Sequence, residues 1–183
     1  RVTIGETPGP STLKDLAPFI DTAAQIVRSS TGEVTLDYGK GLLRLTADKA
    51  QGAIGNLESG GTIRLPAADI ESGHDLASIL LVPLDDQPLA TSARLLLQVM
   101  TEEKPTGFEA ESDSDATFRI RSIGVDPWLF RSPGGTVTLK RPDADRLSIT
   151  ALDLNGYPAG EASAGPIIRL KPDTAYYLIQ TQP

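Results

Sequence analysis

The sequence has no cysteine and only one histidine, which excludes several kinds of active site. Without cysteine there is no thiolate nucleophile, no disulfide and no cysteine-ligated zinc centre. A serine triad or a histidine general base would have to use His74, and its neighbours Ser72, Gly73 and Asp75 predict an exposed turn. A solvated loop histidine is the simpler interpretation, so we expect neither a triad nor a transition-metal site.

Aromatic side chains and clustered basic charges are also scarce. One Trp, four Tyr and four Phe are few for a glycosidase cleft, which needs aromatic platforms around two carboxylates. The 17 Lys and Arg against 24 Asp and Glu give a net charge of -7 and form no cluster suited to a phosphate backbone. No apolar run approaches the roughly 20 residues of a membrane span. We therefore expect no intrinsic hydrolase activity, no nucleic-acid partner and no membrane insertion.

Short runs rich in Val, Ile, Leu and Thr, separated by Gly, Pro, Asp and Asn, follow one another from Gly32 onward. Residues 33–37 and 42–46 flank a turn at 38–41 and predict a hairpin. The continuous apolar runs 78–82 and 94–100 predict strands buried on both faces. Further strands are expected at 50–56, 62–65, 69–72, 118–123, 136–140, 147–153, 167–170 and 176–180. The pattern predicts an all-β fold, a jelly-roll-like antiparallel sandwich of two sheets.

Helix is expected only near the N-terminus. Thr12 can cap a turn with Asp15 three residues on, and Pro18 blocks its continuation, which predicts a helix over 13–17. Residues 20–28 fit either a second short helix or a linker docked on the sandwich. The chain is therefore divided into residues 1–30, an N-terminal lead or linker docked on the sandwich, and residues 31–183, the β-sandwich domain.

Four aromatic residues are candidates for sugar binding, in which an aromatic face stacks on a pyranose ring. Tyr38, Phe108 and Tyr157 lie at predicted turns, where a side chain can be exposed. Trp128 lies in the apolar segment 125–130 and is either a platform or a core or interdomain anchor. The apolar residues that follow it favour a buried anchor.

Glu109, Glu111, Asp113 and Asp115 place alternate carboxylates in a predicted loop. Calcium takes such oxygen ligands, although the spacing is not that of an EF-hand. A solvated acidic loop is the simpler interpretation, and calcium is the single cofactor that we consider.

Several motifs are distributed along the chain: STGEVTLD at 30–37, AQGAIG at 50–55, LDDQPLATS at 84–92, DPW at 126–128, GTVTL at 135–139 and ITALDLNGYP at 149–158. Together they resemble the β-sandwich that follows the TIM-barrel catalytic domain in a group of bacterial glycoside hydrolases and cellulase-like proteins. The resemblance extends over about residues 31–177. It rests on strand and turn chemistry, and the catalytic carboxylates of such enzymes belong to the barrel, so no catalytic residue is transferred.

The resemblance implies a non-catalytic accessory domain that packs beside a TIM-barrel catalytic domain or binds polysaccharide for it. The parent protein is then expected to be secreted, extracellular or periplasmic. An autonomous carbohydrate-binding module and a small stand-alone glycan-active enzyme are the alternative interpretations. Docking on a catalytic domain predicts an exposed apolar patch near residues 2–20.

Overall fold

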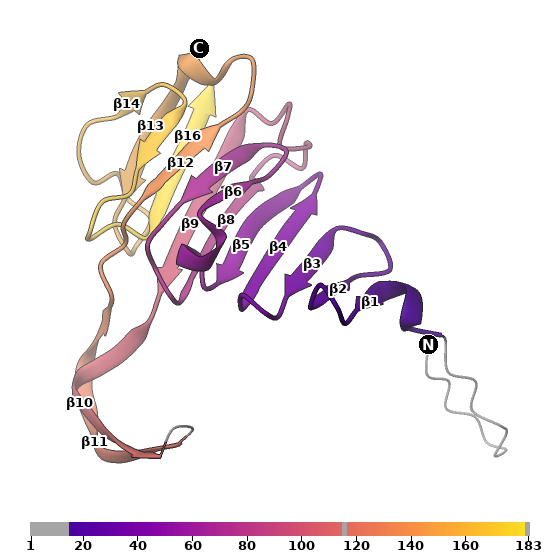
Figure 1. Ribbon diagram of the computed structural model, residues 1–183. Coiled ribbons are helices and arrows are strands. Elements are labelled where there is room, and N and C mark those ends of the chain that lie inside the picture. The colour runs from indigo at the N-terminus through magenta and orange to yellow at the C-terminus, as the bar shows by residue number, and fades with distance from the viewer. Residues whose placement is uncertain (1–14, 115–116, 182–183) are drawn as a thin grey trace, which may run out of the picture.

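The computed structural model describes residues 15–114 and 117–181, which form an antiparallel β-sandwich of two unequal sheets. Figure 1 shows the smaller sheet lying across part of one face of the larger. The predicted all-β sandwich is confirmed. The inequality of the two sheets, ten strands against four, was not indicated by the sequence pattern.

The larger sheet contains ten strands and the smaller one four. In spatial order the larger is β1 (Ile20–Asp21), β2 (Ile26–Arg28), β3 (Val34–Asp37), β4 (Leu42–Ala47), β5 (Ala50–Gly55), β8 (Ala77–Pro83), β9 (Arg94–Thr101), β16 (Tyr176–Thr181), β13 (Leu147–Leu152) and β14 (Ser163–Ala164). The smaller is β15 (Ile167–Arg169), β12 (Thr136–Leu139), β7 (Ala68–Glu71) and β6 (Thr62–Arg64). Three short 3-10 turns are η1 (Ala17–Phe19), η2 (Glu58–Gly60) and η3 (Ala144–Arg146).

A third element, the hairpin of β10 (Glu103–Ser114) and β11 (Thr117–Phe130), belongs to neither sheet. We call this hairpin the arm. It leaves the large sheet after β9, and Figure 1 shows it projecting beyond the body of the sandwich. At its root, the N–H of Arg131 donates to the carbonyl of Glu102 at 2.8 Å, and the hydroxyl of Thr101 donates to the carbonyl of Arg131.

The core lies between the two sheets and is built by alternation along each strand. Every second residue of β8, β9, β13 and β16 is buried, and these residues meet apolar side chains from the smaller sheet. The larger sheet contributes Ala53, Ile79, Leu81, Leu95, Leu97, Val99, Ile149, Tyr177 and Ile179, and the smaller contributes Ile63, Ile70, Val137, Leu139 and Ile168.

The Gln-Gly pair of the second motif has a structural role. Gln51, in β5, is 5% exposed, and its side-chain oxygen accepts the N–H of Ala67, which precedes β7, at 2.7 Å. This hydrogen bond crosses from one sheet to the other inside the core. At Gly52 a Cβ atom would lie 2.2 Å from the carbonyl oxygen of Ile79, so only glycine fits between the adjacent strands.

The loop motif at 84–92 is held by polar contacts of the same kind. One carboxylate oxygen of Asp85 accepts the N–H of Ala93 at 2.6 Å. The side chain of Arg141 donates to the carbonyls of Leu89 and Ser92 at 3.2 and 2.6 Å. Arg141 also makes two hydrogen bonds to the carboxylate of Asp143 (2.9 and 2.8 Å), whose pKa these bonds lower. The motif residues therefore shape the loop and attach it to the end of β12.

The N-terminal segment differs from the expected helices. Within the predicted helix 13–17, residues 13 and 14 lie outside the described residues, and the segment that follows forms only η1. Residues 20–28 contain β1 and β2, which excludes the short helix that was one of the two alternatives for this segment. The carboxylate of Asp21 accepts the N–H of Ala24 at 2.9 Å and closes a tight turn, after which Val27 pairs with Leu36. Pairing with β3 provides the backbone hydrogen bonds that a short helix lacks at its ends.

Replacing Gln51 should destabilise the fold because its removal leaves a buried N–H without a partner. Gln51→Leu is expected to lower the free energy of unfolding by about 1–3 kcal/mol, measured by urea denaturation. The matched control is Gln98→Leu on the opposite face of the same sheet, where Gln98 is half-buried. Equal losses in the two variants would contradict the bridging role of Gln51.

Candidate functional site

The outer face of the large sheet, opposite the small sheet, is mostly apolar over three rows of side chains, beyond which a fourth row contains Arg94, Gln180 and Ser148. Cross-strand pairing places Val27, Leu36, Leu43, Ile54, Ser78 and Met100 in one row, and Val34, Leu45, Gly52, Leu80, Gln98, Tyr176 and Leu152 in the next. A further row contains Val82, Leu96, Leu178 and Thr150. We call the surface of these three rows the back face. None of its residues is charged, and all but the buried Gly52 are half-buried or exposed.

The two surfaces of β3 and β4 differ in composition, the back-face surface being more apolar than the inner one. Figure 1 shows these strands extending past the edge of the smaller sheet. Apart from Leu42, which is fully buried beside Gly60 of η2, the inner surface there carries the half-buried polar residues Thr35, Arg44 and Thr46, as expected for a surface that water reaches. The back face of the same strands carries Leu36 and Leu43 instead. The sequence therefore distinguishes a water-facing surface from one with the composition of a buried layer.

The prediction that 78–82 and 94–100 are buried on both faces is wrong within this chain. In β8 and β9 only the inner residues are buried, whereas the outer ones, such as Leu80 and Leu96, are half-buried. The smaller sheet covers one side, and no described element covers the other. Continuous apolar strands are typical of sheets that are covered on both sides. The outer residues of β8 and β9 therefore have the composition of a covered face, although no described element covers them.

The arm is an amphipathic two-stranded ribbon. Directly paired residues of an antiparallel ribbon share a face, and Phe108 pairs with Ile123, Ala110 with Ile120 and Ser112 with Phe118. Phe118 and Ile123 are 72% and 76% exposed. We call this surface the apolar face of the arm. Its members are Phe108, Ala110, Phe118, Ile120, Ile123 and Val125, and none is charged.

The other face of the arm carries the acidic residues considered for calcium. The predicted loop is wrong, because Glu109, Glu111 and Asp113 lie on β10, and Asp115 lies outside the described residues. Glu111 forms an ion pair with Arg121 at 2.7 Å, and Asp113 forms one with Arg119 at 3.4 Å. Over residues 15–114 and 117–181, no three acidic or histidine side chains gather as a metal site. Two of the described carboxylates, those of Glu111 and Asp113, therefore form cross-strand ion pairs.

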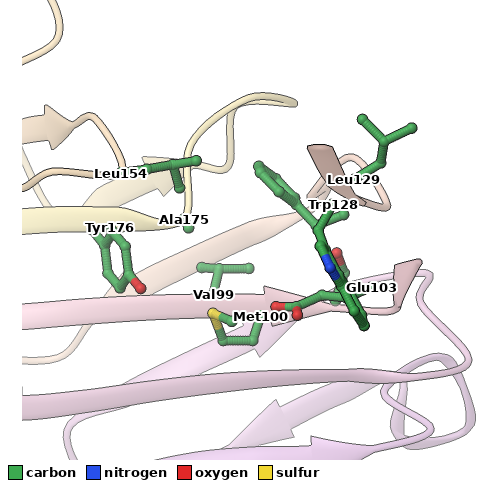
Figure 2. A pocket seen from close by; sticks show the side chains of 10 residues that line it. Val99, Met100, Glu103, Trp128, Leu129, Leu154, Ala175 and Tyr176 are labelled. Atoms are coloured by element: carbon green, nitrogen blue, oxygen red, sulfur yellow. The ribbon is translucent and has the colours of Figure 1, made fainter. Parts of the chain in front are cut away.

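A cavity of about 290 Å³ lies where the arm meets the back face. Met100 and Tyr176 of the back face line it, together with Trp128 and Leu129 of the arm. Figure 2 shows the two arm residues on one side of the cavity and Tyr176, Ala175 and Leu154 on the other. The back face and the arm therefore adjoin each other at this cavity, which residues of both surfaces line.

The preferred interpretation of Trp128 as a buried anchor is wrong for this chain. Its side chain is 62% exposed, and Asp126 and Pro127 interrupt the pairing of β11 just before it instead of forming a turn at the core. Because Trp128 borders both the cavity and a shallow groove of about 490 Å³ along the arm, it stands at a surface suited to contact. An interdomain anchor and a platform both remain consistent with this position.

The predicted aromatic set does not form one platform. Phe108 and Trp128 both line the arm groove, which also includes Asp126. Tyr38 and Tyr157 are exposed but line neither the groove nor the cavity. Tyr38 lies in the turn between β3 and β4, and Figure 1 shows these strands and the arm on different sides of the molecule.

An exposed apolar patch is expected near residues 2–20, of which 2–14 lie outside the described residues. Leu16 and Ile20 are exposed in the remainder. The more extensive apolar surfaces are the back face and the arm. The apolar outer positions of β3 and β4 and the continuous apolar runs of β8 and β9 contain the signal for the back face. The bulges of the arm, in contrast, hide its apolar face from simple periodicity.

His74 is buried rather than exposed, which corrects the expected turn. Its side chain is 8% exposed, and its Nδ1 atom has no hydrogen-bond partner among the described residues. Burial lowers the pKa of His74, the nearby charge of Arg131 lowers it further, and Asp75 opposes both. The carboxylate of Asp75 pairs with Arg131. This arrangement gives His74 no orienting acid of the kind that a triad requires.

Comparison with known proteins finds no matching family model, no similar characterised protein and no similar solved structure. Over the described residues, no helix is long and apolar enough to cross a membrane.

Two adjacent leucines of β9 test the distinction between core and back face. Leu97 is fully buried, so Leu97→Ala should leave a cavity and lower the free energy of unfolding by about 2–5 kcal/mol. Leu96 lies on the back face, so Leu96→Ala should lower it by about 1 kcal/mol or less. Urea denaturation of the isolated chain measures both. Losses of equal size would show that something already covers the back face.

The lowered pKa of His74 predicts a specific pH dependence of stability. Below the ordinary value of 6.5 the unfolded chain takes up a proton before the folded chain does. The free energy of unfolding should therefore fall as the pH drops from 6.5 toward the lowered pKa, by at most about 1.4 kcal/mol per pH unit for one proton. His74→Gln should lack this component in denaturation series at pH 5–8. An unchanged slope in the variant would show that other groups cause it.

Proposed function

We propose that this chain is a non-catalytic β-sandwich accessory domain of a secreted carbohydrate-active enzyme, and that its back face packs against the TIM-barrel catalytic domain of that enzyme. The observation that carries the proposal is the uncharged, apolar back face, for which the described residues provide no cover. The motifs at 30–37, 50–55 and 84–92, which resemble the corresponding segments of such domains, provide independent support.

The size of the back face fits a stable interface between domains. From β2 to β13 the sheet crosses seven spacings between strands, about 34 Å in all at roughly 4.8 Å each. Three rows of side chains span about 13 Å along the strands. The three rows hold 17 positions in all, and each position occupies about 32 Å² (roughly 4.8 by 6.6 Å). The back face therefore covers roughly 540 Å², or about 1,100 Å² when both partners are counted, which falls within the range of roughly 600–1,500 Å² for interfaces between domains.

The described residues give little support to catalysis by this chain. Glycoside hydrolysis commonly uses two carboxyl groups about 5–10 Å apart on either side of the bond that is cleaved. Glu103 is the single carboxylate lining the cavity at the arm root, and Asp126 is the single one lining the arm groove. Neither hollow therefore supplies the required pair.

Docking is tested by mixing this chain with the separately produced catalytic domain of the parent enzyme. Size-exclusion chromatography with light scattering should detect a one-to-one complex, and titration calorimetry should give its affinity. Leu43→Asp, on the back face, should weaken binding at least about 30-fold because an unpaired charge would be buried in the interface. Thr35→Asp, on the opposite surface of β3, should change the affinity less than twofold.

Equal affinities of the two variants, or no complex with the unaltered chain, would contradict the docking proposal. Both variants must retain the melting temperature of the unaltered chain for the comparison to be valid. Circular dichroism provides that control.

Sugar binding is the second candidate function, and the pairing of Trp128 with Phe108 in the arm groove favours it. Affinity electrophoresis through a panel of soluble glycans separates the two functions. An accessory domain that only docks should migrate unchanged through every glycan. Retardation that Trp128→Ala abolishes without changing the melting temperature would instead favour a carbohydrate-binding module.

A further inference from the structure

The apolar face of the arm resembles a contact surface that lacks its partner. An isolated two-stranded ribbon is at best marginally stable in water, and one apolar face normally packs on something else. Here the apolar side chains of Phe118 and Ile123 are mostly exposed to solvent. On the opposite face the charged side chains of Glu111 and Asp113 are paired with arginines. The two faces therefore differ in the way expected of a ribbon that lies on an apolar surface.

The arm reaches a partner larger than a peptide. The 12 residues of β10, at about 3.3 Å each, extend about 40 Å. A globular domain of about 250 residues has a diameter of roughly 45 Å. One domain resting on the back face is therefore large enough to reach along the arm as well.

The cavity at the arm root connects the two surfaces. Met100 and Tyr176 belong to the back face, Trp128 and Leu129 belong to the arm, and all line the same hollow. No charged group separates the back-face residues from those arm residues in the lining, apart from Glu103 at the first position of β10. A domain covering the back face would meet the arm across this cavity.

The chemistry of the arm favours a protein over a lipid surface or a glycan. An anionic membrane attracts clustered Lys and Arg, but the chain has a net charge of -7, and Arg119 and Arg121 are paired with acids. A glycan requires hydrogen-bonding groups beside the aromatic rings. The members of the apolar face have hydrocarbon side chains, and few polar groups lie beside them. These are Ser112, which pairs with Phe118, Lys104, whose Nζ lies 5.9 Å from the centre of the Phe108 ring, and Asp126 in the arm groove.

We propose that the arm is a clasp whose apolar face lies on the same domain that covers the back face, with the cavity at its root receiving an apolar side chain of that domain. This inference rests on the docking function proposed above. The back face supplies the area, and the arm extends the contact beyond the edge of the sheet.

Because the chain has no cysteine, introduced thiols can report on each surface separately. Ile123→Cys places a thiol on the apolar face of the arm, Glu109→Cys places one on its polar face, and Leu43→Cys places one on the back face. These side chains lie outside the core, so each variant should keep the melting temperature of the unaltered chain. The rate of reaction with a thiol reagent is measured with and without a saturating amount of the catalytic domain.

The clasp predicts at least a tenfold slower reaction in the complex for Ile123→Cys and Leu43→Cys, and less than a twofold change for Glu109→Cys. Protection of Leu43→Cys alone would overturn the clasp and leave docking intact. Protection of no thiol would overturn both proposals. Equal protection of the thiols at Ile123→Cys and Glu109→Cys would show that the arm does not bind through its apolar face alone, and would overturn the clasp.

The same reagent distinguishes a second copy of this chain as the occupant. If the thiol of Ile123→Cys became protected with rising concentration of the chain alone, with a matching rise in mass by light scattering, the arm would serve self-association and the clasp would be overturned. A constant reaction rate and a monomeric mass are the expected results.

Discussion

A β-sheet has two faces, and this chain supplies a covering layer for only one face of its large sheet. The four-stranded sheet packs on the inner face and completes a core that is apolar apart from a few polar residues such as Gln51. The back face is equally free of charge, yet its residues, such as Leu36 and Leu80, remain half-buried among their own neighbours. Apolar area released from water is the main source of stability in folding and association. Burial of the back face would add such stabilisation, and among the described residues no element is placed to bury it.

The arm follows from the same constraint. A chain that docks through a flat sheet gains little resistance to sliding or rotation, because a flat apolar surface has few directional contacts. A ribbon projecting from one edge supplies such contacts at a distance from the centre of the interface. Its root is fixed to the sandwich by the backbone hydrogen bond between Arg131 and Glu102 and by the ion pair between Arg131 and Asp75. Attachment at the root limits the orientations of the arm and so lowers the ordering cost of the proposed contact.

The motifs that resemble accessory domains of glycoside hydrolases have structural explanations in this fold. Gln51 joins the two sheets through one buried hydrogen bond, and Gly52 permits the close approach of β5 and β8. Asp85 and Arg141 organise the loop that follows β8. The motif residues Gln51, Gly52 and Asp85 therefore maintain the scaffold, and their presence carries no information on a ligand. The surfaces proposed for docking lie elsewhere, on residues whose common feature is the absence of charge.

Sequence periodicity by itself determined the all-β class, most strands and the apolar character of β8 and β9, because alternation and turn residues act over a few positions. It also contained the evidence for a layer on each side of the large sheet. Only the tertiary structure decided that the chain fills one of those layers, that 20–28 adds strands to the sheet edge, that His74 is buried and that Trp128 is exposed. Each of these depends on contacts between segments far apart in the chain. Local pattern carries no information on which distant segment covers which face, and the bulges of the arm shift the alternation that would otherwise reveal its two faces.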